Sequence, residues 1–503
     1  MRQYLFDGLG PRTVWAFVAS AGLSAVVISF VKPVTIIICL LAAMSLPFAF
    51  LAVSQGTRKL KSLRKHLTVW HILWLLLCLS ALVFRIRDTK SIRDEPVDLS
   101  AAYRILLVGI TAAVLLLYQS LRRSDWIRPM FRGIIGALGV YSLISMFSTA
   151  WSIYPAWTLY KSLEYSVDVA ALAAILVTVG SVDAYKILLD WMWVLIAGLL
   201  GMVWLGAALW PDKALFPDVG LIGVRLAGVL PAVDQDTVGE WSAILAIVAL
   251  SRLLSQSRNR QGFYWVVLTV SLLTLVLAQA RTAIVGFVLG SVLVLIFSKR
   301  LRMIGVLVLA IGLLISLTSF GNLAQRFWER GDSEETRQGF TGRQPVWEYG
   351  WSMFLKQPVT GYGAYAGGRF AVVAVAANNQ LLSNTLNDYM EILLGTGLCG
   401  LVPIVFVILA TWRFLIQGLR EGRLPAQSRR VAIEAVGVLA VMTTESFFST
   451  ELIWHPAQVF LVIVGFAEVL RRHRLATLVT SDSRHRSDIS VWSQVQSSGP
   501  FTL

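Results

Sequence analysis

The sequence predicts an all-α polytopic membrane protein: a transmembrane helical bundle of about 12–14 spans with one long extracytoplasmic loop. Three observations predict this class. Of 503 residues, 56% are hydrophobic and only 15% are charged, and the mean hydropathy is +0.69. Apolar runs occur from one end of the chain to the other. Basic residues gather in short loops between those runs. A soluble enzyme is therefore excluded.

Individual apolar runs have the length that a membrane requires. Crossing the hydrocarbon core takes about 20 apolar residues. Examples are Val34 to Ser54, Leu67 to Phe84, Ile105 to Leu117 with its flanks, and Ile304 to Phe320. Because backbone groups in lipid must pair internally, each run is expected to form a continuous helix. Thr13 to Val31 lacks a small-residue cleavage site and is followed by another span, so we expect no cleavable signal.

The net charge of +15 indicates an orientation in the membrane. In a soluble protein it would suggest nucleic acid, but here the loops explain it, and no nucleic-acid partner is expected. By the positive-inside rule the basic loops face the cytoplasm, so both termini lie inside and the long loop lies in the periplasm. The expected location is the bacterial inner (plasma) membrane. The basic loops fall within residues 58–65, 122–132, 252–260, 299–302, 413–430 and 471–474.

The same pattern divides the chain into four parts. N-terminal transmembrane helices occupy residues 1–320, and the long periplasmic loop occupies 321–387. C-terminal transmembrane helices follow over 388–476, and a Ser-rich, disordered cytoplasmic tail covers 477–503. Within the long loop, Pro345 to Leu355 is predicted to be a short amphipathic helix.

Arginines in the outward-facing loops are the first candidates for a binding site. Arg225 lies in the loop from Pro211 to Asp236, Arg281 lies in a tight turn between two spans, and Arg343 lies in the long loop. A guanidinium group matches phosphate oxygens in a bidentate fork, so a cluster at the membrane surface suits a lipid-linked diphosphate. Interfacial snorkelling or pairing with nearby acids is the alternative. That alternative is preferred for the remaining arginines beside an acidic run, Arg326, Arg330 and Arg337.

Three carboxylates are candidates for proton transfer. Asp388 and Glu391 are three residues apart, one helical turn, and Glu445 lies near the outer end of an apolar span. Buried carboxylates at such positions are costly and often functional, although an interhelical hydrogen bond or an arginine partner explains Glu445 equally well. Asp234 and Asp236 are expected to cap the next helix.

Metal and cofactor chemistry have no support in the sequence. Only five histidines occur, and His455 is the one predicted on the outer side. The three cysteines, Cys39, Cys78 and Cys399, lie in apolar runs and are expected to be small core residues. No cofactor and no metal site are predicted.

Several short motifs, taken in order, resemble the bacterial O-antigen ligase and O-antigen and exopolysaccharide polymerase superfamily. The strongest are P-V-T-G-Y-G at Pro358 to Gly363 and N-D-Y-M-E-I-L-L-G-T-G-L-C-G-L at Asn387 to Leu401. Weaker matches, all placed on the predicted outer side, lie at Ser148 to Pro155, Arg225 to Gly228, Ala280 to Ala283, Gly342 to Trp347 and Thr444 to Ser446.

The resemblance implies a GT-C-like, metal-independent glycosyltransferase of the integral membrane. Its donor would be a polyprenyl-diphosphate-linked glycan, such as undecaprenyl diphosphate carries, and its partners would be the lipid bilayer and other polysaccharide assembly proteins. In motif terms Arg225, Arg281 and Arg343 match the family arginines that bind the donor diphosphate. Aromatic side chains of the long loop are candidates for stacking on sugar rings.

One residue departs from the family pattern. The ligases carry a histidine directly before the Asn of the second motif, and this chain has Leu386 there. Leucine cannot take a proton. Asp388, Glu391 or His455 could replace the base, the chain could belong to a polymerase branch without it, or it could be an inactive binding or assembly component.

Two classes of function follow. The preferred one is an enzyme that polymerises a cell-surface polysaccharide, an exopolysaccharide or O-antigen, with O-antigen ligation to lipid A-core in lipopolysaccharide biosynthesis as the alternative. The other is a non-catalytic transporter or flippase of lipid-linked glycans, which needs the same affinity without bond chemistry.

Overall fold

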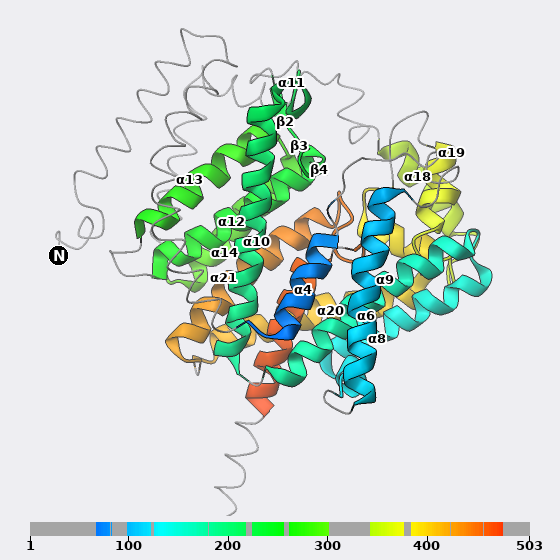
Figure 1. Ribbon diagram of the computed structural model, residues 1–503, viewed down its shortest axis with the longest axis horizontal. Coiled ribbons are helices and arrows are strands. Elements are labelled where there is room, and N and C mark those ends of the chain that lie inside the picture. The colour runs from blue at the N-terminus through cyan, green and yellow to red at the C-terminus, as the bar shows by residue number, and fades with distance from the viewer. Residues whose placement is uncertain are drawn as a thin grey trace, which may run out of the picture.

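The protein is helical almost throughout the part of the chain that the computed structural model describes (Figure 1). The described residues are 67–80, 82, 98–121, 125–179, 181–217, 224–255, 261–300, 343–376, 384–422, 424–455 and 457–475. Within them, the strands form only two small two-stranded sheets, β1–β2 and β3–β4. The all-α prediction is therefore confirmed.

The elements follow one another in the order of the chain. The first half contains α4 (Val69–Ser80), α6 (Leu99–Ser120), α7 (Ile127–Met130), α8 (Gly133–Phe147), η3 (Ser148–Trp151), α9 (Pro155–Thr178), α10 (Val182–Leu209), α11 (Pro211–Ala214), β1 (Leu215–Pro217), β2 (Val224–Leu226), β3 (Gly228–Val229) and β4 (Ala232–Val233). The second half contains α12 (Gln235–Ser255), α13 (Gln261–Ala278), α14 (Arg281–Phe297), α18 (Gln344–Phe354), η5 (Gly367–Val373), α19 (Ala374–Ala376), α20 (Asp388–Arg420), α21 (Ala426–Glu445) and a last helix over residues 458–475.

Five of the described helices are long and apolar enough to cross a membrane. They are Leu99–Ser120, Gly133–Trp151, Val182–Leu209, Gln235–Ser255 and Asp388–Arg420. These spans make the chain a multi-pass membrane protein. α12 lies inside the bundle against α10, α13, α14 and α21, whereas most of α6 is exposed, as a lipid-facing helix would be.

Several sequence predictions lie outside the described residues. Among them are the spans Val34 to Ser54 and Ile304 to Phe320, most of the long loop before residue 343, and the tail. The total of about 12–14 spans and the four-part division therefore stay predictions. The predicted amphipathic helix is present as α18, which buries Val346, Gly350 and Phe354 at four-residue spacing.

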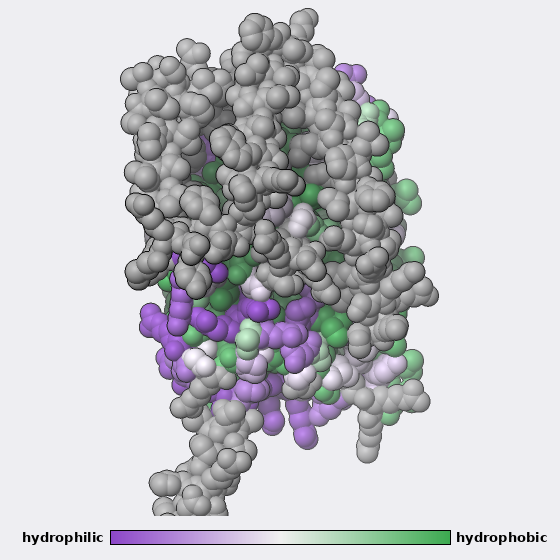
Figure 2. All heavy atoms as spheres, turned by 90° about the vertical axis from the view of Figure 1, so that its left-hand side faces the viewer, coloured by the Kyte–Doolittle hydropathy of each residue, from purple (hydrophilic) through white to green (hydrophobic). Residues whose placement is uncertain are grey.

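The described parts of the basic loops around residues 300, 429 and 472 lie at one end of the bundle, which we call the basic end. Arg429 Nη2 donates to Phe297 O at 2.9 Å, so the start of α21 lies at the end of α14. Arg472 Nη1 donates to Leu176 O at 2.9 Å, which joins the last helix to the end of α9. Figure 2 shows hydrophilic side chains gathered in the lower part of the molecule, with apolar side chains beside them.

The other loops meet at the opposite end, which we call the hairpin end. It contains both β-hairpins, the starts of α12, α14 and α20, and the segment 446–455. The Pro211 to Asp236 segment is more ordered than a plain loop, because β1 pairs antiparallel with β2 and Phe216 stands opposite Arg225. Asp388 N donates to Ser446 O at 2.9 Å and ties the start of α20 to the end of α21.

A buried ion network joins three helices near the basic end. Arg252 of α12 donates to Glu434 of α21 at 2.7 Å and to Asp190 of α10 at 2.6 Å. Trp193 Nε1 adds a hydrogen bond to Glu434 at 2.5 Å, and Lys186 pairs with Asp190 at 2.7 Å. In a low-dielectric interior a charge requires such partners, so this network fixes the relative positions of α10, α12 and α21.

A break in α20 holds another segment of the chain, residues 358–363, against this helix. Gly397 has φ 62° inside this helix, a left-handed conformation that glycine adopts freely. Residues 358–363 fill the break: Tyr362 N donates to Leu394 O at 2.8 Å, and Leu398 N donates to Pro358 O at 2.9 Å. A Cβ at Gly397 would overlap the carbonyl oxygen of Val359. The two strongest family motifs are thus one packed unit.

We expect Arg252→Met to destabilise the protein by about 3 kcal/mol, because it leaves two buried carboxylates without their shared cation. The thermal unfolding midpoint in detergent should fall clearly. Arg300→Met is the control, since Arg300 is exposed at the basic end. Equal midpoints for the two variants would contradict a stabilising role of the network.

Gly397→Ala should be more damaging than Gly422→Ala. Both glycines have positive φ, 62° and 66°, so backbone strain of about 1–2 kcal/mol is common to both. At Gly422 an added Cβ meets nothing within 4 Å, whereas at Gly397 it meets backbone. Folded yield and unfolding midpoint measure the difference; similar losses for both variants would show that the close backbone packing does not matter.

Candidate functional site

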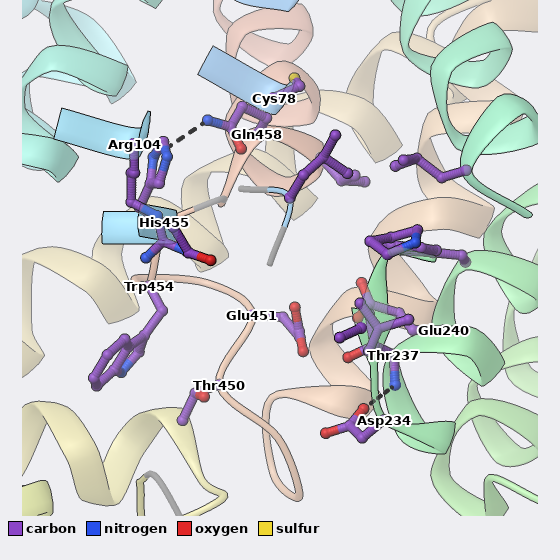
Figure 3. Close-up of a pocket in the computed structure, with 18 of the residues that line it drawn as sticks. Cys78, Arg104, Asp234, Thr237, Glu240, Thr450, Glu451, Trp454, His455 and Gln458 are labelled. Atoms are coloured by element: carbon purple, nitrogen blue, oxygen red, sulfur yellow. Dashed lines mark hydrogen bonds between the residues drawn. The ribbon is translucent and has the colours of Figure 1, made fainter. Parts of the chain in front are cut away.

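A cavity of about 390 Å³ lies at the hairpin end (Figure 3). Its walls come from α4, α6, α9, α10, β4, α12, η5, α21, the segment 446–455 and the start of the last helix. The polar and charged lining residues are Asp98, Ser100, Arg104, Lys161, Asp234, Thr237, Glu240, Arg369, Asn384, Thr450, Glu451, His455 and Gln458. Four aromatic residues, Trp157, Tyr160, Trp241 and Trp454, share the lining. Aromatic faces beside charged groups are suited to a ligand that is both polar and ringed, such as a sugar.

One wall of the cavity carries positive charge from Arg104, Lys161 and Arg369. Lys161 is 3% exposed and pairs with Glu164 at 2.6 Å. The Arg369 guanidinium lies 5.1 Å from the ring centroid of Trp157. Cations held against aromatic rings and away from water keep a stronger field than they would in solvent.

Local sequence explains how these cations reach the cavity. Lys161, Glu164 and Asp168 recur at helical spacing on α9, so they share one face of that helix. Arg369 is in η5, whose Gly367 and Gly368 pack closely against α20. A Cβ at Gly367 would overlap the backbone carbonyl of Leu394, so only glycine lets this turn approach α20 so closely.

The opposite wall is acidic. Asp234, Glu240 and Glu451 line it, and Figure 3 shows these three away from Arg104 and His455. Asp234 accepts from Thr237 N at 2.8 Å and caps the start of α12, as the sequence predicted. Glu451 accepts from Ser449 Oγ at 2.8 Å and is hydrogen-bonded to Glu240. Burial, then the nearby carboxylates of Asp234 and Asp236, raises the pKa of Glu451.

His455 lies between this cavity and the core of the bundle. Its Nδ1 lies 2.7 Å from Asp168 Oδ2, and its Nε2 lies 2.6 Å from Ser80 Oγ. Gln458 Nε2 donates to the other Asp168 oxygen at 3.1 Å. The imidazole is therefore held in one orientation by groups from α4, α9 and the last helix.

The three predicted diphosphate arginines lie at one corner of the hairpin end, beside the cavity but not in its lining. Gln279 Nε2 donates to Val224 O at 3.0 Å, which ties the strand of Arg225 to the residues just before Arg281. Arg343 Nη2 pairs with Asp236 Oδ2 at 3.2 Å. All three arginine side chains are half-buried. Asp236, expected to cap a helix, instead binds one of these arginines.

Glu445 belongs to the same corner. It is the last residue of α21, is 1% exposed, and is hydrogen-bonded to Thr282, beside Arg281. Arg343 and Asp236 are its charged neighbours. Glu445 therefore lies among the predicted diphosphate arginines, which form with it the group we call the arginine corner: Arg225, Arg281, Arg343, Asp236 and Glu445.

The carboxylates of Asp388 and Glu391 both lie in the first turn of α20 and are buried, outside the cavity lining. Asp388 Oδ2 accepts the backbone N–H groups of Glu451 at 2.9 Å and Leu452 at 3.0 Å. Glu391 Oε2 accepts from Thr385 Oγ1 at 2.9 Å and from Thr385 N at 3.2 Å. In this structure both carboxylates hold loops in place. Leu386, next to them, has φ 51° and precedes the cap Asn387.

Sequence reasoning missed most of the cavity. It did not single out Arg104, Lys161, Asp168, Glu240 or Glu451. A usable signal was present, because ionisable residues inside an apolar span are rare and mark function by default. Residues 161, 164 and 168 carry three such groups on one face of a single helix.

Fold and site together define a multi-pass α-helical membrane protein with a charged, aromatic-lined cavity at one end of the bundle. Residues 266–405 match the family model described as O-antigen ligase. This match, over one part of the chain, supports membership of the O-antigen ligase and polymerase superfamily and, in general terms, a function in glycosyl transfer. The segment includes Arg281, Arg343, Asp388 and Glu391. The search of curated proteins finds no match.

Among the described residues, no group of three or more His, Cys, Asp or Glu side chains is arranged to hold a metal ion. Cys78 is buried and Cys399 is exposed, and both are free thiols. Cys39 lies outside the described residues.

The variant Glu451→Gln should become more stable than the wild-type protein as pH rises from about 4.5 to 8. Because the pKa of Glu451 is raised by folding, ionising it costs more in the folded than in the unfolded state. Below the unfolded pKa, about 4.3, both states are protonated and the substitution changes little. Unfolding midpoints of the two proteins across this pH range give the test; a difference that is largest at low pH would contradict it.

Proposed function

We propose that this protein transfers a glycan from a polyprenyl-diphosphate-linked donor to the hydroxyl group of a second lipid-linked glycan, and so polymerises a cell-surface polysaccharide. The observation that carries the proposal is the arginine corner next to a polar, aromatic-lined cavity. Membership in the superfamily supports the reaction type. We place the hairpin end on the periplasmic side of the inner membrane, because the basic loops gather at the other end.

The arginine corner suits the donor diphosphate. Three guanidinium groups offer paired N–H donors to phosphate oxygens and remain charged at any relevant pH. Arg281 also starts α14, where the helix dipole adds partial positive charge. Asp236, which pairs with Arg343 at 3.2 Å, holds that side chain in position before the donor arrives.

The cavity suits the sugars. Trp157, Tyr160 and Trp454 offer ring faces, and Glu240 and Glu451 offer acceptors for hydroxyl groups. A sugar placed there would have its anomeric carbon near the corner where the diphosphate sits. The leaving group is a diphosphate, so stabilising its developing charge supplies much of the rate enhancement.

Leu386 favours polymerisation over ligation. The family ligases are expected to use a histidine at that position, and this chain has none there. Attachment to lipid A-core is thus the second candidate for the acceptor. No metal ion and no cofactor enter the proposed reaction.

The test uses purified full-length protein in proteoliposomes with lipid-linked oligosaccharide extracted from the producing cells. We expect longer glycans with new glycosidic bonds. Arg281→Ala should lower the rate about 100-fold or more, as removal of a preorganised donor to developing charge does. Arg281→Lys should restore only part of it, because the bidentate fork is lost.

Arg300→Ala is the matched control, since Arg300 follows the other end of the same helix α14. An Arg281→Ala protein with the unaltered product profile would contradict the diphosphate role. Movement of the oligosaccharide across the bilayer without new product would instead identify a transporter. Product only when lipid A-core is added would identify a ligase.

A further inference from the structure

The proposed transfer reaction requires a group that takes the acceptor's proton. The position at which the family carries a histidine is Leu386, an apolar side chain. Asp388 and Glu391 are both engaged in holding backbone and Thr385, and neither lines the cavity. The proton acceptor must therefore be sought among the residues that do line it.

His455 has the position and the orientation that this role needs. It lines the cavity, and its side chain is 1% exposed, so it is shielded from bulk water. Asp168 holds Nδ1 at 2.7 Å, and Gln458 holds the second oxygen of Asp168. A carboxylate at Nδ1 directs the basic lone pair to Nε2 and stabilises the imidazolium that forms there.

Ser80 keeps its hydrogen bond whether His455 is neutral or protonated. Its Oγ lies 2.6 Å from His455 Nε2 and also 2.6 Å from Leu77 O, one of the last carbonyls of α4. A hydroxyl has one proton and can donate to only one of these two acceptors at a time. When Nε2 is unprotonated, Ser80 donates to it. When Nε2 carries a proton or binds another donor, Ser80 can donate to Leu77 O without losing a hydrogen bond.

We propose that His455 is the proton acceptor of the transfer reaction. Asp168 is its positioning residue, and Ser80 is a hydrogen-bond partner of Nε2 that the acceptor hydroxyl can replace. This inference rests on the proposed function. The acceptor hydroxyl replaces Ser80 at Nε2 and gives its proton to that nitrogen while its oxygen bonds to the anomeric carbon. The bond from the anomeric carbon to the phosphate oxygen breaks, and the electron pair leaves with the polyprenyl diphosphate. His455 then releases its proton to solvent.

The sequence of contacts from Ser80 through His455 to Asp168 is also that of a serine hydrolase triad. His455 lines the cavity, however, whereas Ser80 is 0% exposed and does not, so the imidazole and not the Ser80 hydroxyl is the group that meets the substrate. Its hydroxyl serves the imidazole and does not attack the substrate.

Charged groups around His455 come from several elements. Asp168, Glu164 and Lys161 face it from α9, and Arg104 faces it from α6, where its Nε donates to Ser80 O at 3.3 Å. The thiol of Cys78, on α4, lies near Asp168. Lys161 and Glu164 neutralise each other at 2.6 Å, so Asp168 is the uncompensated carboxylate in direct contact with the imidazole.

The experiment measures rates of glycan extension in proteoliposomes between pH 5 and 9, with the same extracted lipid-linked oligosaccharide as donor and acceptor. His455→Gln keeps a hydrogen-bonding side chain but cannot hold a proton. We expect its kcat to fall about 100-fold or more with little change in KM, the range typical for loss of a general base. Imidazole added to His455→Ala should restore part of the rate.

The variant Asp168→Asn distinguishes an electrostatic role of Asp168 from a purely structural one, which would leave the pH–rate profile unchanged. Without the negative charge the imidazolium is less favourable, so the acid limb of the pH–rate profile should shift to lower pH. Ser80→Ala should lower kcat by less than about tenfold, because Nε2 of His455 remains the proton acceptor. His71→Gln is the control: it is a buried histidine of α4 outside the cavity lining.

Outcomes separate the two proposals. If the wild-type protein makes no new glycosidic bond, the proposed function fails. If it does, and His455→Gln keeps the wild-type kcat and pH profile, the assignment of His455 fails alone. A loss for Ser80→Ala as large as that for His455→Gln would also overturn it, because Ser80 would then be the reacting group. Unfolding midpoints verify that the variants are folded.

Discussion

The close backbone packing between residues 358–363 and the break in α20 is the constraint on which the hairpin end depends. In a membrane an interrupted helix must find other partners for its freed N–H and C=O groups. At Gly397 those partners are the backbone of Pro358 and Val359, reached because Gly361 and Gly397 lack side chains. This contact also fixes the position of the segment that follows residue 363.

That segment supplies Arg369 to the cavity and holds other parts of the cavity wall in place. Ala364 N donates to Ser148 Oγ at 2.9 Å, and Trp157 Nε1 donates to Tyr365 O at 3.2 Å. Tyr365 OH donates to Ile453 O at 3.2 Å, two residues before His455 in the chain. The start of α9, the turn of Arg369 and the segment of His455 are therefore all positioned through one packed unit.

Charges at the hairpin end are arranged in compensated groups. Lys161 with Glu164 and Arg343 with Asp236 place opposite charges within hydrogen-bonding distance, and the Asp168 carboxylate lies 2.7 Å from His455 Nδ1. In a low dielectric an isolated charge would be prohibitive, whereas a paired one can be kept and used. In the proposed reaction, a diphosphate that enters the arginine corner would exchange partners with groups already in place, which is the preorganisation that transfer to a sugar hydroxyl requires.

The sequence alone determined the all-α membrane class, the separation of basic loops from the other loops, and the resemblance to the superfamily. Hydropathy, loop charge and motif order are local properties, so they can be seen without coordinates. It also found Arg225, Arg281, Arg343 and Glu445, which the structure brings to one corner. Asp388 and Glu391 were found as a helical pair, but their loop-holding contacts could not be predicted, because Thr385, Glu451 and Leu452 reach them only after the chain folds.

The cavity forms only in the tertiary structure. Ser80 and His455 are separated by 375 positions in the chain, and Asp168 and His455 by 287. Only the packing of α4, α9 and the segment 446–455 brings the imidazole within 2.7 Å of both Ser80 and Asp168.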